Sequence, residues 1–187
     1  LLSKLELDEN GHRILKKYAN NVGIEFLSTG FTLESIDFLS KLGLKRFKVP
    51  SGEINNIPLL RKVASQNKPT IISTGMASLG EIEVALKTLY ENNLDKDKIS
   101  VLHCNTAYPT PMEDVNLKAI NTIKNSFDIN VGFSDHTEGI EASIAAVAFG
   151  AKIIEKHFTL DKNMPGPDHK ASIEPEELNN LVISIRN

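Results

Sequence analysis

Six short apolar segments, each followed by a stretch of helical periodicity, constrain the fold more than any other feature of this sequence. They cover residues 24–30, 46–52, 70–75, 99–104, 130–136 and 153–159. Their apolar runs are continuous, whereas a strand with one solvated face alternates apolar and polar residues. The sequence therefore predicts a parallel sheet covered by helices. Further helices are predicted over residues 1–23, where Gly23 ends the pattern, and from about Pro175 to Arg186.

Polar side chains lie at or just beyond the carboxyl end of almost every predicted strand. They are Lys48, Ser51, Ser73, Thr74, His103, Ser134, Asp135, His136 and His157. An open doubly wound sheet would concentrate such residues at one switch point, whereas an α/β (β/α)8 TIM barrel gathers them from all strands around one rim. We therefore predict a TIM barrel. Because such barrels usually need about 250 residues, the 187 residues are expected to form one partial barrel domain, residues 1–187, of about six β/α units.

Two of these strand ends carry a histidine at matched positions. His136 closes the segment NVGFSDH, His157 lies near the end of IIEKHFT, and a helical stretch separates them. In neighbouring parallel strands the two imidazoles would emerge side by side and could supply half of a divalent metal site. The alternative is that each is an ordinary hydrogen-bonded histidine.

Other motifs at the strand ends are open to two interpretations. KVPSGE places Lys48 just beyond a strand, where an inward lysine would suit a phosphate or carboxylate. A surface lysine beside a turn would give the same pattern. Asp135 belongs either to the site or, with Thr137, to the cap of the next helix. The loop PGPDHKAS, which contains Asp168, is either a binding loop or a solvated charged loop.

Composition excludes several classes of function. The net charge of −3 gives no electrostatic reason to expect binding to nucleic acid or to an anionic membrane. The single cysteine, Cys104, excludes an internal disulfide framework and fits a reducing compartment. No apolar run approaches the roughly 20 residues needed to span a bilayer, and the N-terminus has no signal-peptide pattern. We expect a soluble cytoplasmic domain.

Taken together and in this order, the motifs resemble those of a known family. KVPSGEI, ISTGM, HCNTAYPTP, GFSDHTEG, EKHFTLD and GPDHKAS look like successive signatures of the bacterial N-acetylneuraminate (sialic acid) synthases, which include legionaminate and pseudaminate synthases. The resemblance runs from about Ile24 to Ser172. It implies a transferase that condenses phosphoenolpyruvate with an N-acetylated hexosamine of the N-acetylmannosamine type. The products would be a nine-carbon 2-keto sugar acid, such as sialic or legionaminic acid, and phosphate.

The resemblance also implies roles for individual residues. His136 and His157 would hold Mn²⁺, or another divalent metal such as Mg²⁺. Phosphoenolpyruvate would be held by Lys48, Ser51, Ser73 and Ser134. The sugar would face Glu53, Tyr108 and Asp168, of which Glu53 and Asp168 join Lys48 as the catalytic set. Thr29 and Phe31 would line the same pocket, and Asn105 and Thr106 are alternatives for one phosphoenolpyruvate contact.

The family pattern extends beyond this chain. Its first two strands and its C-terminal antifreeze-like domain have no counterpart here, so this polypeptide alone is expected to be inactive or nearly so. A homodimer is expected for the full-length protein.

Two other functions are considered. One is a related phosphoenolpyruvate–aldose synthase, such as the octulosonate or heptulosonate phosphate enzymes. Lys48 and Lys170 are the only obvious rim cations, which favours an unphosphorylated sugar instead. The other is a catalytically inactive barrel that only binds ligands.

Overall fold

The structure, a computed structural model, describes residues 6–187. In these residues one parallel sheet has five strands whose order in space is their order in the chain. The strands are β1 (Phe47–Val49), β2 (Thr70–Ser73), β3 (Ile99–Cys104), β4 (Asn130–Asp135) and β5 (Ile154–Lys156). Sequential parallel neighbours joined by helices are the pattern of a barrel wall, so the predicted parallel α/β fold is confirmed.

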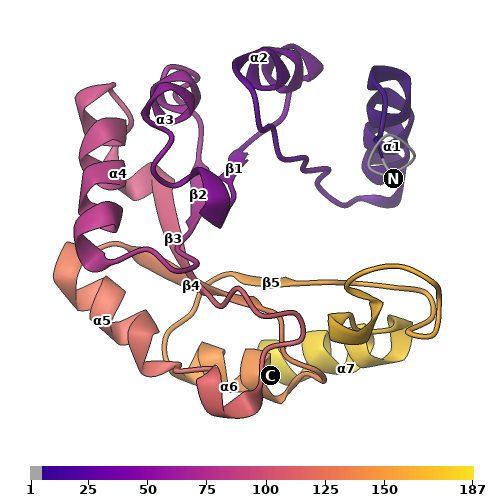
Figure 1. Cartoon of the computed structure of the whole chain (residues 1–187). Helices are drawn as coiled ribbons and strands as arrows, with labels where there is room; N and C mark the ends of the chain where they lie inside the picture. The colour runs from indigo at the N-terminus through magenta and orange to yellow at the C-terminus, as the bar shows by residue number, and fades with distance from the viewer. Residues whose placement is uncertain (1–5) are drawn as a thin grey trace.

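The described residues form seven helices. They are α1 (Glu9–Val22), α2 (Leu33–Leu42), α3 (Ile57–Ala64), α4 (Leu79–Glu91), α5 (Lys118–Phe127), α6 (Glu141–Ala148) and α7 (Pro175–Arg186). Helices α3 to α6 connect the strands and cover their outer side, whereas α1 and α2 precede β1 and α7 follows β5 (Figure 1). Short 3₁₀ turns occur at Ser51–Glu53, Lys96–Lys98, Met112–Asp114 and His169–Ala171. None of the described helices is long and apolar enough to cross a membrane.

Several helix ends follow directly from the sequence. Gly23 and Gly43 end α1 and α2 in the left-handed conformation, with φ of 80° and 79°, which glycine adopts without steric cost. Ser78 begins α4 with a reciprocal capping box to Glu81. These local signals set the helix lengths, and therefore where each following strand begins.

The hydrophobic core lies between the sheet and its outer helices. It includes Phe47 and Phe133 from the strands, and Leu59 and Leu60 from α3, all essentially inaccessible to solvent. Because successive strand residues point to opposite faces, the residues that alternate with this core point to the inner side of the sheet. That inner side carries the polar strand residues Lys48, Ser73 and Ser134.

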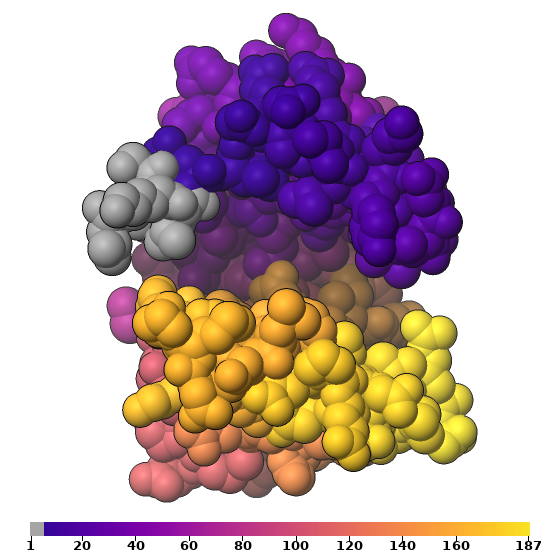
Figure 2. Space-filling model, turned by 90° about the vertical axis from the view of Figure 1, so that its right-hand side faces the viewer, coloured from indigo at the N-terminus to yellow at the C-terminus, as the bar shows by residue number. Residues whose placement is uncertain are grey.

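The sheet is strongly curled. Lys48 on β1 and Glu155 on β5 form an ion pair at 3.1 Å although they come from opposite edges of the sheet. In a flat sheet the two strands would lie about 19 Å apart, beyond the combined reach of the two side chains. The described residues thus form a half-barrel, and its open side shows a hollow between the indigo N-terminal segments and the orange and yellow C-terminal ones (Figure 2).

Two predictions about the N-terminal part need revision. The predicted strand over residues 24–30 is wrong: this segment is irregular, Ile24 is 65% exposed, and no backbone hydrogen bonds pair it with β1 within the described residues. Apolar composition yields a strand only where a neighbour satisfies the backbone groups. Here the segment is attached through the Glu25–Arg46 ion pair instead. The predicted opening helix begins at Glu9, and its predicted first five residues lie outside the described part.

Candidate active site

Lys48, Ser134 and Glu155 meet on the concave face of the sheet. Lys48 Nζ lies 3.1 Å from both carboxylate oxygens of Glu155, and Ser134 Oγ donates to the same carboxylate at 2.7 Å. Lys48 and Ser134 are buried, whereas Glu155 is partly exposed. A buried ammonium next to a hydroxyl is well suited to bind an anion, and Glu155 supplies its counter-charge.

His136, which follows β4, is held in one tautomer. Its Nδ1 lies 2.7 Å from the backbone carbonyl of Asn105. Because a carbonyl only accepts, Nδ1 carries the proton and Nε2 keeps its lone pair. Burial lowers the pKa of His136; the Asn105 carbonyl opposes this, and the neighbouring His157 adds to it. A neutral imidazole with a free Nε2 is the form that ligates metal ions.

His157 lies next to His136, as their matched strand ends predict. The two ring centroids are 5.3 Å apart and the rings are nearly perpendicular, at 80°. Tyr108 covers His136 with a centroid separation of 3.9 Å and contacts His157 edge-on at 5.6 Å. Asp168 Oδ2 is 3.9 Å from His157 Nδ1. Burial raises the pKa of the Tyr108 phenol, and nearby negative groups, Asp168 among them, raise it further.

Two buried polar atoms at the same end of the sheet have no hydrogen-bond partner in residues 6–187. They are Ser73 Oγ, at the end of β2, and Asn105 Oδ1, just after β3. Buried polar groups are normally satisfied, so such atoms need an explanation. An exposed amide or hydroxyl would carry no such information. Here both atoms belong to residues that the sequence predicts to contact ligand.

Ser51 and Thr106 approach one another across a glycine. Gly75 has φ of 52°, and a Cβ atom at this position would lie 2.6 Å from Ser51 Cβ and 3.3 Å from Thr106 Cγ2. Only glycine fits both the backbone conformation and the space. The turn after β2 therefore brings the loops after β1 and β3 together at the rim.

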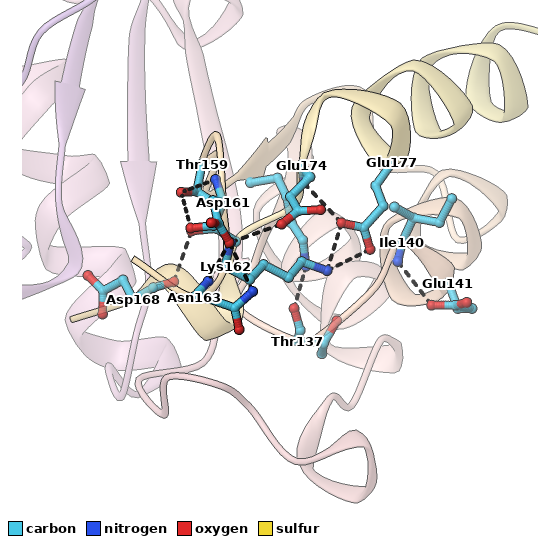
Figure 3. Close-up of polar contacts among 12 residues, drawn as sticks. Thr137, Ile140, Glu141, Thr159, Asp161, Lys162, Asn163, Asp168, Glu174 and Glu177 are labelled. Carbon is cyan, nitrogen blue, oxygen red and sulfur yellow. Dashed lines mark hydrogen bonds and ion pairs between the residues drawn. The ribbon is translucent and has the colours of Figure 1, made fainter. Parts of the chain in front are cut away.

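A polar network fixes the loop that carries Asp168 (Figure 3). Thr159 Oγ1 bonds to His169 Nδ1 at 2.9 Å, and Lys162 Nζ donates to Glu177 of α7 at 2.7 Å. Asp168 itself has φ of 68°. A parallel bridge between Phe158 and Ile173 closes the base of the loop. This loop is therefore an ordered one.

Three predicted site residues are not joined to this cluster. Thr29 lines a separate cavity of about 320 Å³ between α1 and α2. Phe31 is 60% exposed, and Glu53 accepts a hydrogen bond from Asn56 at 2.6 Å. In the described residues, no hydrogen bond, ion pair or ring contact joins these three to the cluster of Lys48, Ser134, Glu155, Tyr108, His136, His157 and Asp168.

Two polar strand-end residues point to the opposite, helix-covered face. His103 Nε2 donates to the carbonyl of Val115 at 2.9 Å, and its ring stacks on Phe133. Asp135 accepts from the backbone and hydroxyl of Thr137, but α6 begins only at Glu141. Asp135 thus orders the turn before the helix instead of capping the helix itself.

Glu155 is a candidate site residue that sequence reasoning missed, since it contacts both Lys48 and Ser134. It lies two positions before His157 in IIEKHFT, so strand alternation places both on the same face. This spacing is a signal in the sequence that could have identified Glu155.

The two histidines would supply only part of a divalent metal site. Among residues 6–187, no group of three His, Cys, Asp or Glu side chains is arranged to hold a metal ion. Two neighbouring imidazoles are present, one with a free Nε2, and the unpartnered Asn105 Oδ1 belongs to the residue whose backbone carbonyl accepts from His136 Nδ1. Such a site would need water or substrate oxygens to complete it, as in open, catalytic metal sites.

Comparisons with known proteins agree with the motifs. The model of a family described as NeuB matches residues 1–187. The N,N'-diacetyllegionaminic acid synthase of Campylobacter jejuni is 58% identical over 186 residues, which are 100% of this chain and 56% of that protein. The enzyme of the same name from Legionella pneumophila is 54% identical over 188 residues, covering 100% of this chain and 53% of that protein.

A solved structure gives the same result for the fold. The N-acetylneuraminic acid (sialic acid) synthetase of Leptospira borgpetersenii, crystallised with citrate, superposes with a TM-score of 0.92 at 36% identity. The match covers 97% of this chain and 62% of that one. The chain thus spans a little over half the length of the relatives it matches.

Proposed function

Because this chain belongs to the NeuB family, we propose that it carries active-site residues of a synthase that condenses phosphoenolpyruvate with an N-acetylated hexosamine. Carbon 3 of phosphoenolpyruvate bonds to the aldehyde carbon of the open-chain sugar, water adds at carbon 2, and phosphate leaves. The products are a nine-carbon 2-keto sugar acid and inorganic phosphate. The two legionaminic acid synthases at 58% and 54% identity support an acceptor with two acetamido groups, alongside N-acetylmannosamine itself.

The observation that carries this proposal is the pairing of an anion site with two histidines on one concave face. Lys48 and Ser134 converge at Glu155, and Ser134 Oγ lies 3.5 Å from His136 Nε2. The proposed reaction joins an anionic substrate to a sugar aldehyde. The anion site and the two histidines must therefore be adjacent. Charged donors fixed in a shielded pocket stabilise developing charge better than water does.

Each residue has a distinct role in this proposal. Lys48 binds the phosphate or carboxylate of phosphoenolpyruvate as a buried point charge, and the unpartnered Ser73 Oγ donates to the same ligand. Glu155 exchanges its contact with Lys48 for one with the reacting centre, where its carboxylate stabilises positive charge or accepts a proton from water. Tyr108 and Asp168 border the histidines on the side where the sugar would enter.

His136 and His157 would hold a divalent ion such as Mn²⁺ or Mg²⁺. When bound there, this ion supplies Lewis acidity toward the sugar aldehyde. The chain's own contribution is to keep His136 neutral through burial and to orient its ring through the Nδ1 bond to Asn105. Tyr108 packs over the ring and limits access of water to it.

The test is phosphate release by the full product of the gene, supplied with phosphoenolpyruvate, Mn²⁺ and either N-acetylmannosamine or its diacetamido counterpart. We expect stoichiometric phosphate and 2-keto acid, identified by mass spectrometry. Product formed only from a pentose or tetrose phosphate would contradict the proposal and favour a heptulosonate- or octulosonate-type synthase. Ligand binding without any turnover would favour an inactive binding barrel.

A further inference from the structure

The last rung shared by β4 and β5 is a buried ion pair that the proposed chemistry does not use. Asp135 and Lys156 are partners in the parallel register, and Lys156 Nζ lies 3.1 Å from Asp135 Oδ2. Their side chains are 0% and 4% exposed. Both lie on the helix-covered side of the sheet, where Ser143 of α6 donates to the same carboxylate.

The contacts of this pair extend to both sides of His136. Asp135, the residue before it, accepts hydrogen bonds from the backbone and hydroxyl of Thr137, the residue after it. Lys156 donates to the backbone carbonyl of Thr137 in addition to pairing with Asp135. One lysine from β5 thus holds the two neighbours of a histidine that follows β4.

A buried ion pair is weak evidence for stability. Removing two charges from water is costly, and apolar residues of similar volume are often just as stable at such positions. The best-attested benefit of a buried polar pair is that it fixes one register among several. Register has a specific consequence here, because each charged residue directly precedes one of the two histidines.

The paired part of β4 and β5 stops one residue before each histidine. The β4–β5 ladder ends at Asp135 and Lys156. Beyond this rung the carbonyl of His136 accepts from Thr110, and that of His157 accepts from Ile173. The ion pair therefore lies at the last paired position of the two strands, one residue before each histidine.

We propose that Asp135 and Lys156 are positioning residues that fix the placement of His136 relative to His157. They act through the sheet, from its helix-covered face to its concave face, and do not touch substrate or metal. The inference rests on the proposed function only for the role of the two histidines. Their placement can be measured without any ligand.

The experiment compares Lys156→Met, Asp135→Asn/Lys156→Met and a matched control, Lys152→Met. Lys152 also links these two segments, since its Nζ donates to Asn130 at the opposite end of β4. Circular dichroism melts establish which variants fold. The readout is the nuclear Overhauser effect between the ring protons of the two histidines, recorded without metal. Mn²⁺ affinity is measured in parallel from the electron paramagnetic resonance signal of the free ion.

We expect the inter-ring signal to be present in the parent and in Lys152→Met, and to be lost in both Lys156 variants. The Mn²⁺ dissociation constant should rise about tenfold or more in those variants, the usual effect of losing an outer-shell contact. An unchanged inter-ring signal in a folded Lys156 variant overturns the inference.

The two proposals fail in different ways. If the parent itself does not bind Mn²⁺, the metal part of the proposed function is wrong, while the inter-ring signal still decides the positioning role. If neither Lys156 variant folds, Ser143→Ala takes their place, since it removes a single partner of Asp135. A weakened inter-ring signal then supports the inference, and an unchanged one overturns it.

Discussion

Replacing Ser73 with alanine should make the protein more stable and weaken its binding of phosphoenolpyruvate. Ser73 is 2% exposed, and its Oγ has no hydrogen-bond partner in residues 6–187. An unsatisfied buried polar group costs about 1–3 kcal/mol, and alanine removes it while leaving a void of only one oxygen atom. We expect the free energy of unfolding to rise by about 1 kcal/mol. For a chain of this size, that raises the melting temperature by about 2–4 °C.

The same substitution should weaken phosphoenolpyruvate binding. A hydrogen bond to a charged acceptor contributes about 1.5–3 kcal/mol, which corresponds to a roughly 10- to 150-fold rise in the dissociation constant. Titration calorimetry measures this directly, and thermal melts measure the stability. The matched control is Ser143→Ala, because that equally buried hydroxyl donates to Asp135, and its loss should lower the melting temperature.

Opposite signs for the two serines are the essential result. If Ser73→Ala lowered the melting temperature as Ser143→Ala is expected to do, Ser73 Oγ would have a hydrogen-bond partner within the protein. It would then not be an unsatisfied group that awaits a ligand. If the melt rose but phosphoenolpyruvate bound as before, the hydroxyl would be unrelated to the ligand. Either result would refute the reasoning.

Other substitutions test the remaining parts of the site. Lys48→Met should weaken phosphoenolpyruvate at least about tenfold and the sugar far less, with the exposed Lys45→Met as control; equal effects on both ligands would remove Lys48 from its role. His157→Ala should abolish saturable Mn²⁺ binding, and near-parental binding would exclude His157 as a ligand. Lys162→Met should raise the KM for the sugar, because it loosens the loop that carries Asp168, while leaving phosphoenolpyruvate affinity within about twofold. Burial raises the pKa of the Cys104 thiol, so iodoacetamide at pH 8 should label it only after denaturation; rapid labelling of the native protein would contradict its burial.

The parallel sheet and most helix boundaries could be predicted because they depend on local information. Continuous apolar runs mark doubly buried strands, and Gly23 and Gly43 mark helix ends wherever those helices pack. The proximity of His136 and His157 was also predictable, since two matched strand ends in neighbouring units must emerge together.

The features that sequence reasoning missed depend on partners elsewhere in the chain. Residues 24–30 have the composition of a strand but no backbone neighbour to pair with in the described structure. His103 and Asp135 end strands as their site neighbours do, yet they point to the other face. Strand position alone does not fix the face; the phase of alternation does. Counting that phase back from His157 would have identified Glu155.

The long sequence separation of Lys48 and Glu155 has a consequence for how the protein is made. The strands pair in the order in which they leave the ribosome, so the sheet can grow by adding one neighbour at a time, with short loop closures. The contact between Lys48 and Glu155 spans 107 residues and cannot form until β5 has emerged and docked. Until then Lys48 lacks its counter-charge. The proposed binding site is therefore among the last parts of the nascent chain to mature, and interrupted synthesis yields a partial sheet with an unneutralised cation on its inner face.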